Sequence, residues 1–527
     1  MISPVQAFRI LREKIKPEWK AAFAACFFMG LLAHMPVLLS DIPNHDGLAY
    51  MYSVQNNIVA GRWFLTVACG ISSYYTLPWL IGILGLTYLG LAAAALCEVL
   101  EVRKTWAAAL CGAMLSVFPA MASTFAYMFT MDGYMMALLL AVLAVLLVKK
   151  YRFGFLPGAL CLALSMGIYQ AYLPFAMILS VFSIWRLLPG KAPEGAGGKK
   201  SAWLQEKIVS ALRYLYMGIL GAISYYAILQ VLLKLQGKQL ADYQGIEGVA
   251  SGAAAEIGLI GGLKSMYADF AAFTLKGNVL FQNVFSLGAL VLLAVLVLAA
   301  AFVLLGRRKF RKKPLILALI ALSAAALPAM TNIILLLSPS VNYHLLMRYQ
   351  WVLYLIGAVA LISSCDFRGK AGVWAEWAGL AAASVLVFCY CITDNIAYAN
   401  LQKKYEKTYA YCIRLLDRIE QTEGYYPGIP IAMIGVVGEE QFPVTDLTLS
   451  VTSGMIGMSG DSLLYKGENY REFIRHYLGA TLNILPAEAM GEMYYSEEYM
   501  SMDSFPGPDS IRIIDGIMYI KTENTVR

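Results

Sequence analysis

The sequence has little charge. Only 14% of its 527 residues are Asp, Glu, Lys or Arg, whereas 59% are hydrophobic. Soluble domains carry about 25% charged and about 45–50% apolar residues. This shortage of charge excludes a single soluble enzyme and is typical of a chain that folds largely within lipid.

Several short motifs of soluble enzymes are also missing. The chain has no GxxxxGK(S/T) phosphate loop, no CxxC pair and no HExxH zinc motif, so we expect neither an ATP-driven pump nor a zinc protease. Nine cysteines are too few for a disulfide scaffold. The 19 prolines and 44 glycines are too few for a collagen or a disordered chain.

Long apolar runs, in contrast, are abundant. A helix rises about 1.5 Å per residue, so roughly 20 residues cross a hydrocarbon core about 30 Å thick. Because runs of about this length recur along the whole chain, we predict a mainly α, polytopic membrane protein with about 11 transmembrane helices. The runs lie at 21–40, 76–100, 106–123, 134–148, 154–169, 171–187, 214–234, 283–305, 314–335, 346–365 and 371–392.

Lys and Arg are distributed unevenly over the connections between these runs. Up to residue 370, alternate connections starting with the N-terminal segment contain 24 of them, and the remaining connections contain 4. The clearest basic run is RRKFRK at 307–312. Because Lys and Arg are retained in cytoplasmic loops, this bias predicts a cytoplasmic N-terminus. The basic residues behind the net charge of +7 then set the topology and contact anionic lipid. We expect no nucleic acid as a partner.

Two of the predicted outer connections are long, at 41–75 and 235–282. Both carry apolar and aromatic residues at irregular helical spacing, so we predict helices that lie in the outer interface. Connections this long are uncommon unless they serve a function, and a binding site is one such function.

The composition changes after residue 392, and we divide the chain there into a membrane domain (1–392) and an extracytoplasmic α+β domain (393–527). Residues 395–421 have the apolar spacing of an amphipathic helix. IPIAMIGVV at 429–437 is typical of a buried strand, and SIRIIDGIMYIKT at 510–522 predicts a hairpin around Asp515–Gly516.

Ionisable residues at membrane depth are costly, so those at the mouths of the spans are functional candidates. The first set lies in SDIPNHDGLAY at 40–50. A carboxylate here acts either as a general base for a hydroxyl or as a ligand of a divalent ion, with His45 as a second ligand. Asp is also a favoured helix N-cap. We assign Asp41 to capping and leave Asp46 open between the two roles.

Asp132 and Arg62 form the next candidates. Asp132 precedes the fourth apolar run, in FTMDGYMMALLL, where it is either a functional carboxylate or an N-cap aligned with the helix dipole. Arg62 is the only basic residue of the connection 41–75. An Arg among aromatics clamps a phosphate through two parallel hydrogen bonds, or it extends to the interface against Trp63.

VNYHLLMRYQW at 341–351 and IYQAYLP at 168–174 complete the set. On a helix His344 and Arg348 share a face, and an Arg near the outer surface suits a lipid phosphate. His344 is either a sugar ligand or an uncharged interfacial histidine. The other candidates for sugar or acceptor binding, with an aromatic belt as the alternative for the tyrosines, are Tyr169, Gln170, Tyr172 and Tyr349.

Three stretches carry a resemblance to a known family. They are NHDGLAYMYSVQNNIVAGRWF (44–64) running into LPWLIGILGLTYLGLAA (77–93), FAYMFTMDGYMMALLLAVLAVLL (125–147) and LALSMGIYQAYLPFAMILSV (162–181). They resemble the bacterial glucosyltransferase II family, whose members are known for serotype-converting glucosylation of O-antigen. MRYQW at 347–351 is similar in placement, and 407–421 looks like members that carry an outer C-terminal domain.

The resemblance implies a GT-C class enzyme that uses a polyprenyl-phosphate sugar, undecaprenyl-phosphate glucose above all, and inverts the anomeric carbon. In this family an acidic residue of the first outer loop is the base, which matches Asp46. Arg62 matches a basic position of the family, and Asp132 matches an acidic one. Acidic residues often form a pair in that loop. Here the neighbour is His45, so a requirement for Mg²⁺ or Mn²⁺ stays open, and we expect no other cofactor.

We therefore expect a glycosyltransferase of the bacterial cytoplasmic membrane that moves glucose or a similar hexose to a cell-surface glycan such as O-antigen or teichoic acid. Its partners are the lipid-linked donor, the glycan acceptor and membrane lipid. The alternative is a flippase or transporter of lipid-linked sugars. That class needs polar residues deep on the cytoplasmic half as well, and those halves look almost wholly apolar.

Overall fold

The computed structural model describes most of the chain. The basic run 307–312, the end of the predicted strand at 435–437 and parts of the two long connections (51, 71–76, 242–253 and 277–278) lie outside the described residues. The described residues are 3–6, 13–50, 52–70, 77–187, 199–241, 254–276, 279–306, 314–338, 341–365, 367, 369–434, 450–452, 454, 455, 457, 458, 463, 464 and 467–522.

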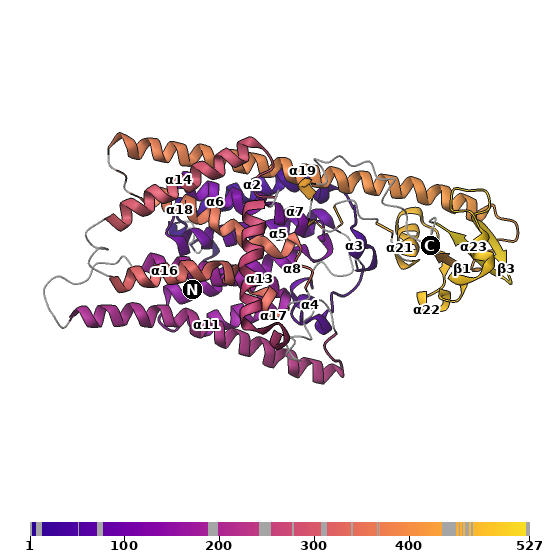
Figure 1. The fold of residues 1–527 in the computed structure, drawn as a ribbon, viewed down its shortest axis with the longest axis horizontal. Coiled ribbons are helices and arrows are strands. Elements are labelled where there is room, and N and C mark those ends of the chain that lie inside the picture. Colours follow the sequence, from indigo (N-terminus) through magenta and orange to yellow (C-terminus); the bar gives the residue numbers. More distant parts are fainter. Residues whose placement is uncertain are drawn as a thin grey trace.

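The fold is mainly helical and elongated, with a bundle of long helices at one end and a small α/β unit at the other (Figure 1). Each apolar run of the sequence contributes a helix to the bundle. These helices are α2 (Pro17–Leu39), α5 (Pro78–Leu100), α6 (Thr105–Val117), α7 (Pro119–Phe125), α8 (Met131–Lys150), α9 (Phe155–Ile168), α10 (Leu173–Leu187), α11 (Lys199–Gln236), α14 (Val284–Gly306), α16 (Pro314–Thr331), α18 (Val352–Ser364) and α19 (Lys370–Glu420).

Among the described residues, nine helices are long and apolar enough to cross a membrane, or ten when the bent pair α6–α7 counts as one span. The predicted number of 11 is therefore not confirmed. The difference is α9, which has only 14 residues, whereas a span needs roughly 20. The chain is thus a polytopic membrane protein with nine or ten candidate spans in its described part.

The bend of 47° between α6 and α7 has its cause in Pro119. Proline has no backbone N–H, so the carbonyl four residues earlier, that of Leu115, loses its partner within the helix. The buried Tyr349 hydroxyl donates to this carbonyl. The next carbonyl, that of Ser116, lies 2.8 Å from His34 Nε2. Neighbouring helices therefore satisfy the carbonyls that the break exposes, as a membrane interior requires.

The two long connections differ in structure. The described part of 41–75 forms short helical segments: α3 (His45–Tyr50), η1 (Ile58–Ala60) and α4 (Leu65–Ala68). The second connection contains α13 (Ala254–Lys276), a 23-residue helix with a kink at Gly258. It lies across the long helices rather than along them (Figure 1). Shorter helical turns elsewhere are η2 (Met128–Thr130), η3 (Gln170–Tyr172), α17 (Ile334–Leu337) and η4 (Leu345–Trp351).

The C-terminal unit contains a four-stranded sheet of order β2-β1-β4-β3. β1 pairs in parallel with β2 and β4, and β3 and β4 form the predicted hairpin around Asp515–Gly516, both at positive φ. One face of the sheet packs on α19 and α21, and the other packs on α22, η7 and α23. The elements are β1 (Pro430–Ile434), α21 (Gly467–Phe473), η6 (Ile474–Leu478), β2 (Asn483–Ile484), α22 (Ala487–Met490), η7 (Met493–Tyr495), α23 (Glu497–Ser501), β3 (Ile511–Ile514) and β4 (Ile517–Lys521).

Helix α19 joins the two parts. It continues for 51 residues without interruption, from the bundle to the sheet (Figure 1), so the boundary at 392/393 falls within a continuous helix. Its last turns supply Cys412, Leu415 and Ile419 to the core under the sheet. Leu48 of α3 belongs to the same core. The first outer connection is thus packed into the C-terminal unit as well as into the bundle.

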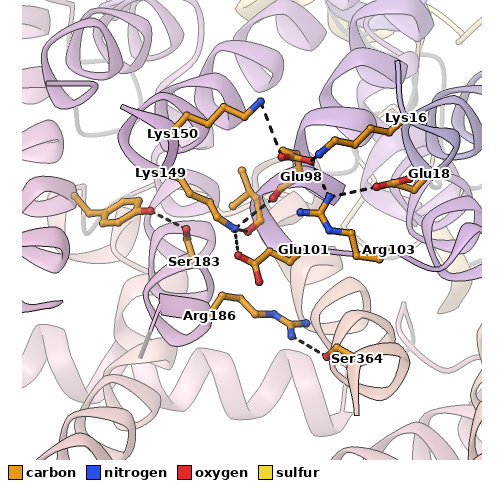
Figure 2. A network of polar contacts seen from close by, with 12 residues as sticks. Lys16, Glu18, Glu98, Glu101, Arg103, Lys149, Lys150, Ser183, Arg186 and Ser364 are labelled. Atoms are coloured by element: carbon orange, nitrogen blue, oxygen red, sulfur yellow. Dashed lines mark hydrogen bonds and ion pairs between the residues drawn. The ribbon is translucent and has the colours of Figure 1, made fainter. Parts of the chain in front are cut away.

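A network of charged side chains (Figure 2) lies where α2 begins and where α5 and α8 end, at the end of the bundle away from α3. Glu98, near the end of α5, accepts from Lys16 at 2.8 Å and from Arg103 at 3.0 Å. Arg103 also contacts Glu18, and Lys149 pairs with Glu101. These charged residues lie at the ends of the helices and in the connections between them, not deep within the spans. The predicted connections 1–20, 101–105 and 149–152 meet here, and we call this group the ion-pair network.

Candidate functional site

A polar cavity of about 620 Å³ lies at the end of the bundle that carries α3. Its walls come from segments far apart in the sequence: the first outer connection, η2, the start of α8, and the segment that leads into η4. The residues that line it are His45, Asp46, Tyr50, Val54, Gln55, Asn56, Asn57, Val59, Ala60, Arg62, Leu65, Tyr127, Phe129, Thr130, Tyr134, Tyr169, Ala241, Asn342, His344, Leu346 and Met347.

Asp46 and His45 lie side by side at the start of α3. His45 Nε2 is 3.7 Å from Asp46 Oδ1, and the Asp46 side chain is 38% exposed. The helix begins here because the Asn44 side chain accepts a hydrogen bond of 2.7 Å from the Gly47 N–H. The N-cap is therefore Asn44, and the assignment of Asp41 to capping is wrong. Asp46 is left with a carboxylate that faces the cavity.

Asp41 lies between α2 and α3. Loss of hydration raises the pKa of its carboxyl to about 6. Its backbone carbonyl accepts from the Tyr477 hydroxyl at 3.2 Å. Asp41 thus connects the start of the outer loop with η6 of the C-terminal unit.

Arg62 lies where two tyrosines meet. Its Nη1 donates to the Tyr134 hydroxyl at 3.0 Å, and its guanidinium carbon is 4.8 Å from the centre of the Tyr169 ring. The Tyr134 and Tyr169 rings stack at 4.6 Å. Tyr134 was not among the sequence candidates, although it stands only two residues after Asp132. Its pairing with Arg62 depends on contacts between α8 and a loop 72 residues away.

A tight turn presents Arg62. Gly61 has φ +75°, and a Cβ built there would lie 2.5 Å from both Gln170 Nε2 and the Tyr225 hydroxyl. Gln170 Nε2 donates to the Ala60 carbonyl at 3.0 Å and also lies 2.9 Å from the Tyr225 hydroxyl. Gln170 therefore fastens the turn to α11, and only glycine fits at position 61.

A second, apolar groove of about 380 Å³ adjoins the polar cavity. Arg62, Tyr169 and Met347 line both spaces. The rest of the groove is mostly aliphatic and aromatic, and its side chains come from α9, η3, α10, α11 and the α16–η4 connection. These residues are Met166, Gln170, Ala171, Leu173, Ala222, Tyr225, Tyr226, Leu229, Leu240, Ile334, Leu337, Ser338 and Val341.

Asp132 does not line the polar cavity. It is 2% exposed in the first turn of α8, and its Oδ1 accepts from the Gly133 N–H at 2.9 Å. Its carboxylate interacts with the Cys69 thiol, whose pKa is raised by burial and by this negative charge. Its position agrees with the alternative of a carboxylate aligned with the helix dipole.

Arg348 is held in an ion pair with Asp269 of α13. Nη1 lies 2.6 Å from Oδ2, and Nη2 lies 2.9 Å from Oδ1, so the pairing is bidentate. The guanidinium also stacks on Tyr343, with 4.0 Å from its carbon to the ring centre. Asn332 donates to the same carboxylate at 3.0 Å. Arg348 therefore joins α13 to η4, and it lines neither the polar cavity nor the apolar groove.

The remaining residues predicted from the sequence fall into two groups, those that line the polar cavity and those that are buried in the core. His344 and Tyr169 line the polar cavity. Tyr172 is 1% exposed and Tyr349 is 2% exposed, and their rings pack edge to face at 6.4 Å within the core. The structure thus brings together Asp46, His45, Arg62, Tyr169 and His344, and it places Tyr172 and Tyr349 among the buried helix contacts.

No group of three or more His, Cys, Asp or Glu suited to a metal ion occurs among the described residues. His45 and Asp46 are a His–carboxylate pair on the wall of the polar cavity. Two side chains are fewer than a protein site usually supplies, and a divalent ion bound here would draw further oxygen ligands from substrate phosphate or water.

The family model described as "Glucosyl transferase GtrII" matches residues 35–363, which is more than half of the chain. This range includes every residue of the polar cavity and of the apolar groove. Neither the curated proteins nor the solved structures contain a match to the chain.

Proposed function

Since the chain belongs to the glucosyl transferase GtrII family, we propose that it transfers glucose or a similar hexose from a polyprenyl-phosphate donor to a cell-surface glycan. In this proposal the polar cavity faces the outside of a bacterial cytoplasmic membrane, and the ion-pair network faces the cytoplasm. The basic residues of the ion-pair network favour that orientation, because Lys and Arg are retained on the cytoplasmic side.

The observation that carries the proposal is the meeting of the two spaces at Arg62. A lipid-linked sugar needs an apolar channel for its prenyl chain, a cation for its phosphate and a polar chamber for its sugar. The apolar groove, Arg62 and the polar cavity provide these three parts in that order. Their volumes, about 380 and 620 Å³, fall within the range of roughly 300–1,000 Å³ typical of ligand pockets.

The chemistry follows from the residues around the cavity. The acceptor hydroxyl attacks the anomeric carbon of the donor sugar from the side opposite the phosphate. The Asp46 carboxylate takes the hydroxyl proton, and the bond from the anomeric carbon to the phosphate oxygen breaks, its electron pair leaving with polyprenyl phosphate. Arg62 stabilises the charge that grows on the phosphate, and the anomeric configuration inverts.

A transporter of lipid-linked sugars requires a polar path through the whole bundle. At the end opposite the cavity, the described charges engage one another: Glu98 binds Lys16 and Arg103, and Lys149 binds Glu101. These paired charges lie at the ends of the helices, whereas a transporter needs polar residues deep within the spans, which favours the enzyme.

The first test replaces the base, as Asp46→Asn, in protein purified in detergent. We expect transfer of radiolabel from undecaprenyl-phosphate glucose to a surface polysaccharide fraction to fall by about 10³-fold, because a positioned base contributes roughly 10²–10⁴-fold. Asp417→Asn, an acidic residue of α19 whose carboxylate accepts from Gln421, serves as the matched control and should retain wild-type transfer.

A chelator lane run in parallel tests the requirement for a divalent ion. Undiminished transfer by folded Asp46→Asn protein would remove Asp46 from the role of base. Wild-type protein that releases no label from the lipid, yet moves lipid-linked glucose across vesicles, would favour the transporter.

A further inference from the structure

The first outer connection and the C-terminal unit meet beside the polar cavity. Asn469 of α21 donates to the His45 carbonyl at 3.2 Å, and the Tyr477 hydroxyl of η6 donates to the Asp41 carbonyl at 3.2 Å. The rings of Tyr52 and His476 lie 4.6 Å apart. We call this contact of residues 41–50 and 52–54 with α21–η6 the seam.

Exposed aromatic side chains gather along the seam. Tyr50, the last residue of α3, is 52% exposed, and Tyr52, two residues later, is 45% exposed. Tyr50 and Val54 also line the polar cavity. The aromatic surface of the seam therefore continues into the space that contains Asp46. Exposed apolar groups beside a cavity mark binding surfaces more often than those scattered singly.

The positions of the two spaces decide which substrate uses this surface. The donor, in the function proposed above, occupies the apolar groove and reaches the cavity past Arg62. The acceptor must reach Asp46 by another path, and the seam is the side of the cavity where the C-terminal unit adjoins α3. We propose that the acceptor glycan binds at the seam, with the rings of Tyr52 and His476 as a platform for the sugar next to the reacting hydroxyl.

The chemistry of the two rings suits a neutral sugar. The C–H face of a pyranose packs on aromatic rings, and a tyrosine supplies both such a face and a polar hydroxyl. His476 Nε2 lies 3.2 Å from Glu472 Oε2. Burial lowers the pKa of His476, which favours the uncharged ring. Its Nε2–H then donates to Glu472, which leaves Nδ1 to accept from a sugar hydroxyl.

This inference rests on the proposed function for the identity of the bound sugar, so its test separates binding from transfer. The full chain in detergent is incubated with labelled undecaprenyl-phosphate glucose and a water-soluble surface polysaccharide extracted from cells that express the protein. We expect Tyr52→Ala and His476→Ala each to raise the apparent KM for the polysaccharide about tenfold. The KM for the lipid donor should stay within twofold of wild type.

Two further variants control for fold and for the ring itself. Tyr426→Ala removes a tyrosine of similar exposure, 53%, that follows the far end of α19, and it should leave both KM values unchanged. Tyr52→Phe keeps the stacking face and should restore most of the polysaccharide affinity. Polysaccharide KM values for Tyr52→Ala and His476→Ala within twofold of wild type would overturn the proposal.

A binding measurement keeps the two hypotheses distinct. Saturation-transfer NMR reports contact between the protein and the same polysaccharide without any donor. If the wild-type protein transfers no glucose, the proposed function fails. The seam proposal then stands if the signal is present in wild type and Tyr426→Ala and lost in Tyr52→Ala, and it falls if the signal is absent from wild type or unchanged in Tyr52→Ala.

Discussion

Arg62 and Arg348 lie on the same side of the bundle, and both were candidates for the donor phosphate. The charge of the Arg348 guanidinium is paired within the protein, because Asp269 binds it through both oxygens and Tyr343 stacks on it. The region around Arg62 is built differently, since the guanidinium rests between the Tyr134 hydroxyl and the Tyr169 ring and lines two connected spaces. Arg348, paired with a carboxylate, joins two helices, whereas Arg62 lies on the wall of both the polar cavity and the apolar groove.

The largest effect is expected on transfer activity when Arg62 is replaced. Arg62→Ala should lower transfer from undecaprenyl-phosphate glucose on the order of 100-fold. The variant lacks the guanidinium that would donate hydrogen bonds to the leaving phosphate in a site shielded from water. Arg348→Ala is the matched comparison and should lose activity only in proportion to folded protein. Steady-state transfer assays with the melting temperature measured in parallel separate the two. A raised donor KM in well-folded Arg348→Ala protein would instead support the phosphate role predicted for Arg348.

The second prediction concerns the ion pair itself. Arg348→Ala should destabilise the fold by roughly 2–3 kcal/mol, since it leaves the Asp269 carboxylate, whose side chain is 26% exposed, without its partner. Asp269→Ala should have a similar effect, and the double variant should cost less than the sum of the two. Thermal melting followed by tryptophan fluorescence tests this cycle. Additive effects would contradict a coupled pair.

The third prediction concerns the turn that presents Arg62. Gly61→Ala should cost about 1–2 kcal/mol and lower transfer, because the new methyl meets Gln170 and Tyr225 and the backbone has φ +75°. Gly237→Ala is the control, since Gly237 also has positive φ but nothing within 4 Å of the added Cβ. Gly237→Ala measures the cost of the positive φ alone, so the difference between the two variants gives the cost of the contact with Gln170 and Tyr225. Equal losses of activity in both variants would show that the contact with Gln170 does not matter.

The smallest effect is expected for Asp41 at the edge of the site. Its folded-state pKa of about 6 lies above the ordinary value of 3.8, so the folded state binds this proton more tightly than the unfolded state does. The contribution of Asp41 to stability is then fully present below pH 3.8 and is lost as the pH rises toward 6. Melting temperatures of wild type and Asp41→Asn from pH 4 to 7 should show the variant gaining relative to wild type as the pH rises. A constant difference would contradict the raised pKa.

Much of the fold could be predicted from the sequence because the signals are local. Apolar runs of helical length gave a helix in each case, and the Asp515–Gly516 turn gave the hairpin, since both depend on residues close in the chain. The count of spans could not be predicted from apolar length alone. α9 is only 14 residues long, and α19 continues past the predicted domain boundary to 51 residues.

The residues of the candidate site could be predicted only in part from local sequence signals. Five of the residues chosen by type and position line one cavity: Asp46, His45, Arg62, Tyr169 and His344. Residue type and position gave the same weight to Tyr172 and Tyr349, which the structure buries among helices. The Tyr349 hydroxyl is needed by the Leu115 carbonyl, which Pro119 deprives of its helical partner. Leu115 lies on another helix, 234 residues away in the sequence, so the residues around Tyr349 give no sign of this hydrogen bond.

The sequence by itself determined that this protein is a helical membrane protein with a small sheet near its C-terminus, and that its family is that of the GtrII glucosyl transferases. Hydrophobic length, turn chemistry and short motifs are properties of neighbouring residues, so no tertiary structure is needed to establish them. Only the tertiary structure decided which arginine lines the cavity and which binds Asp269, and that the C-terminal unit adjoins α3. Those outcomes depend on which charges and aromatic rings from distant segments come within a few ångströms, and packing alone determines that.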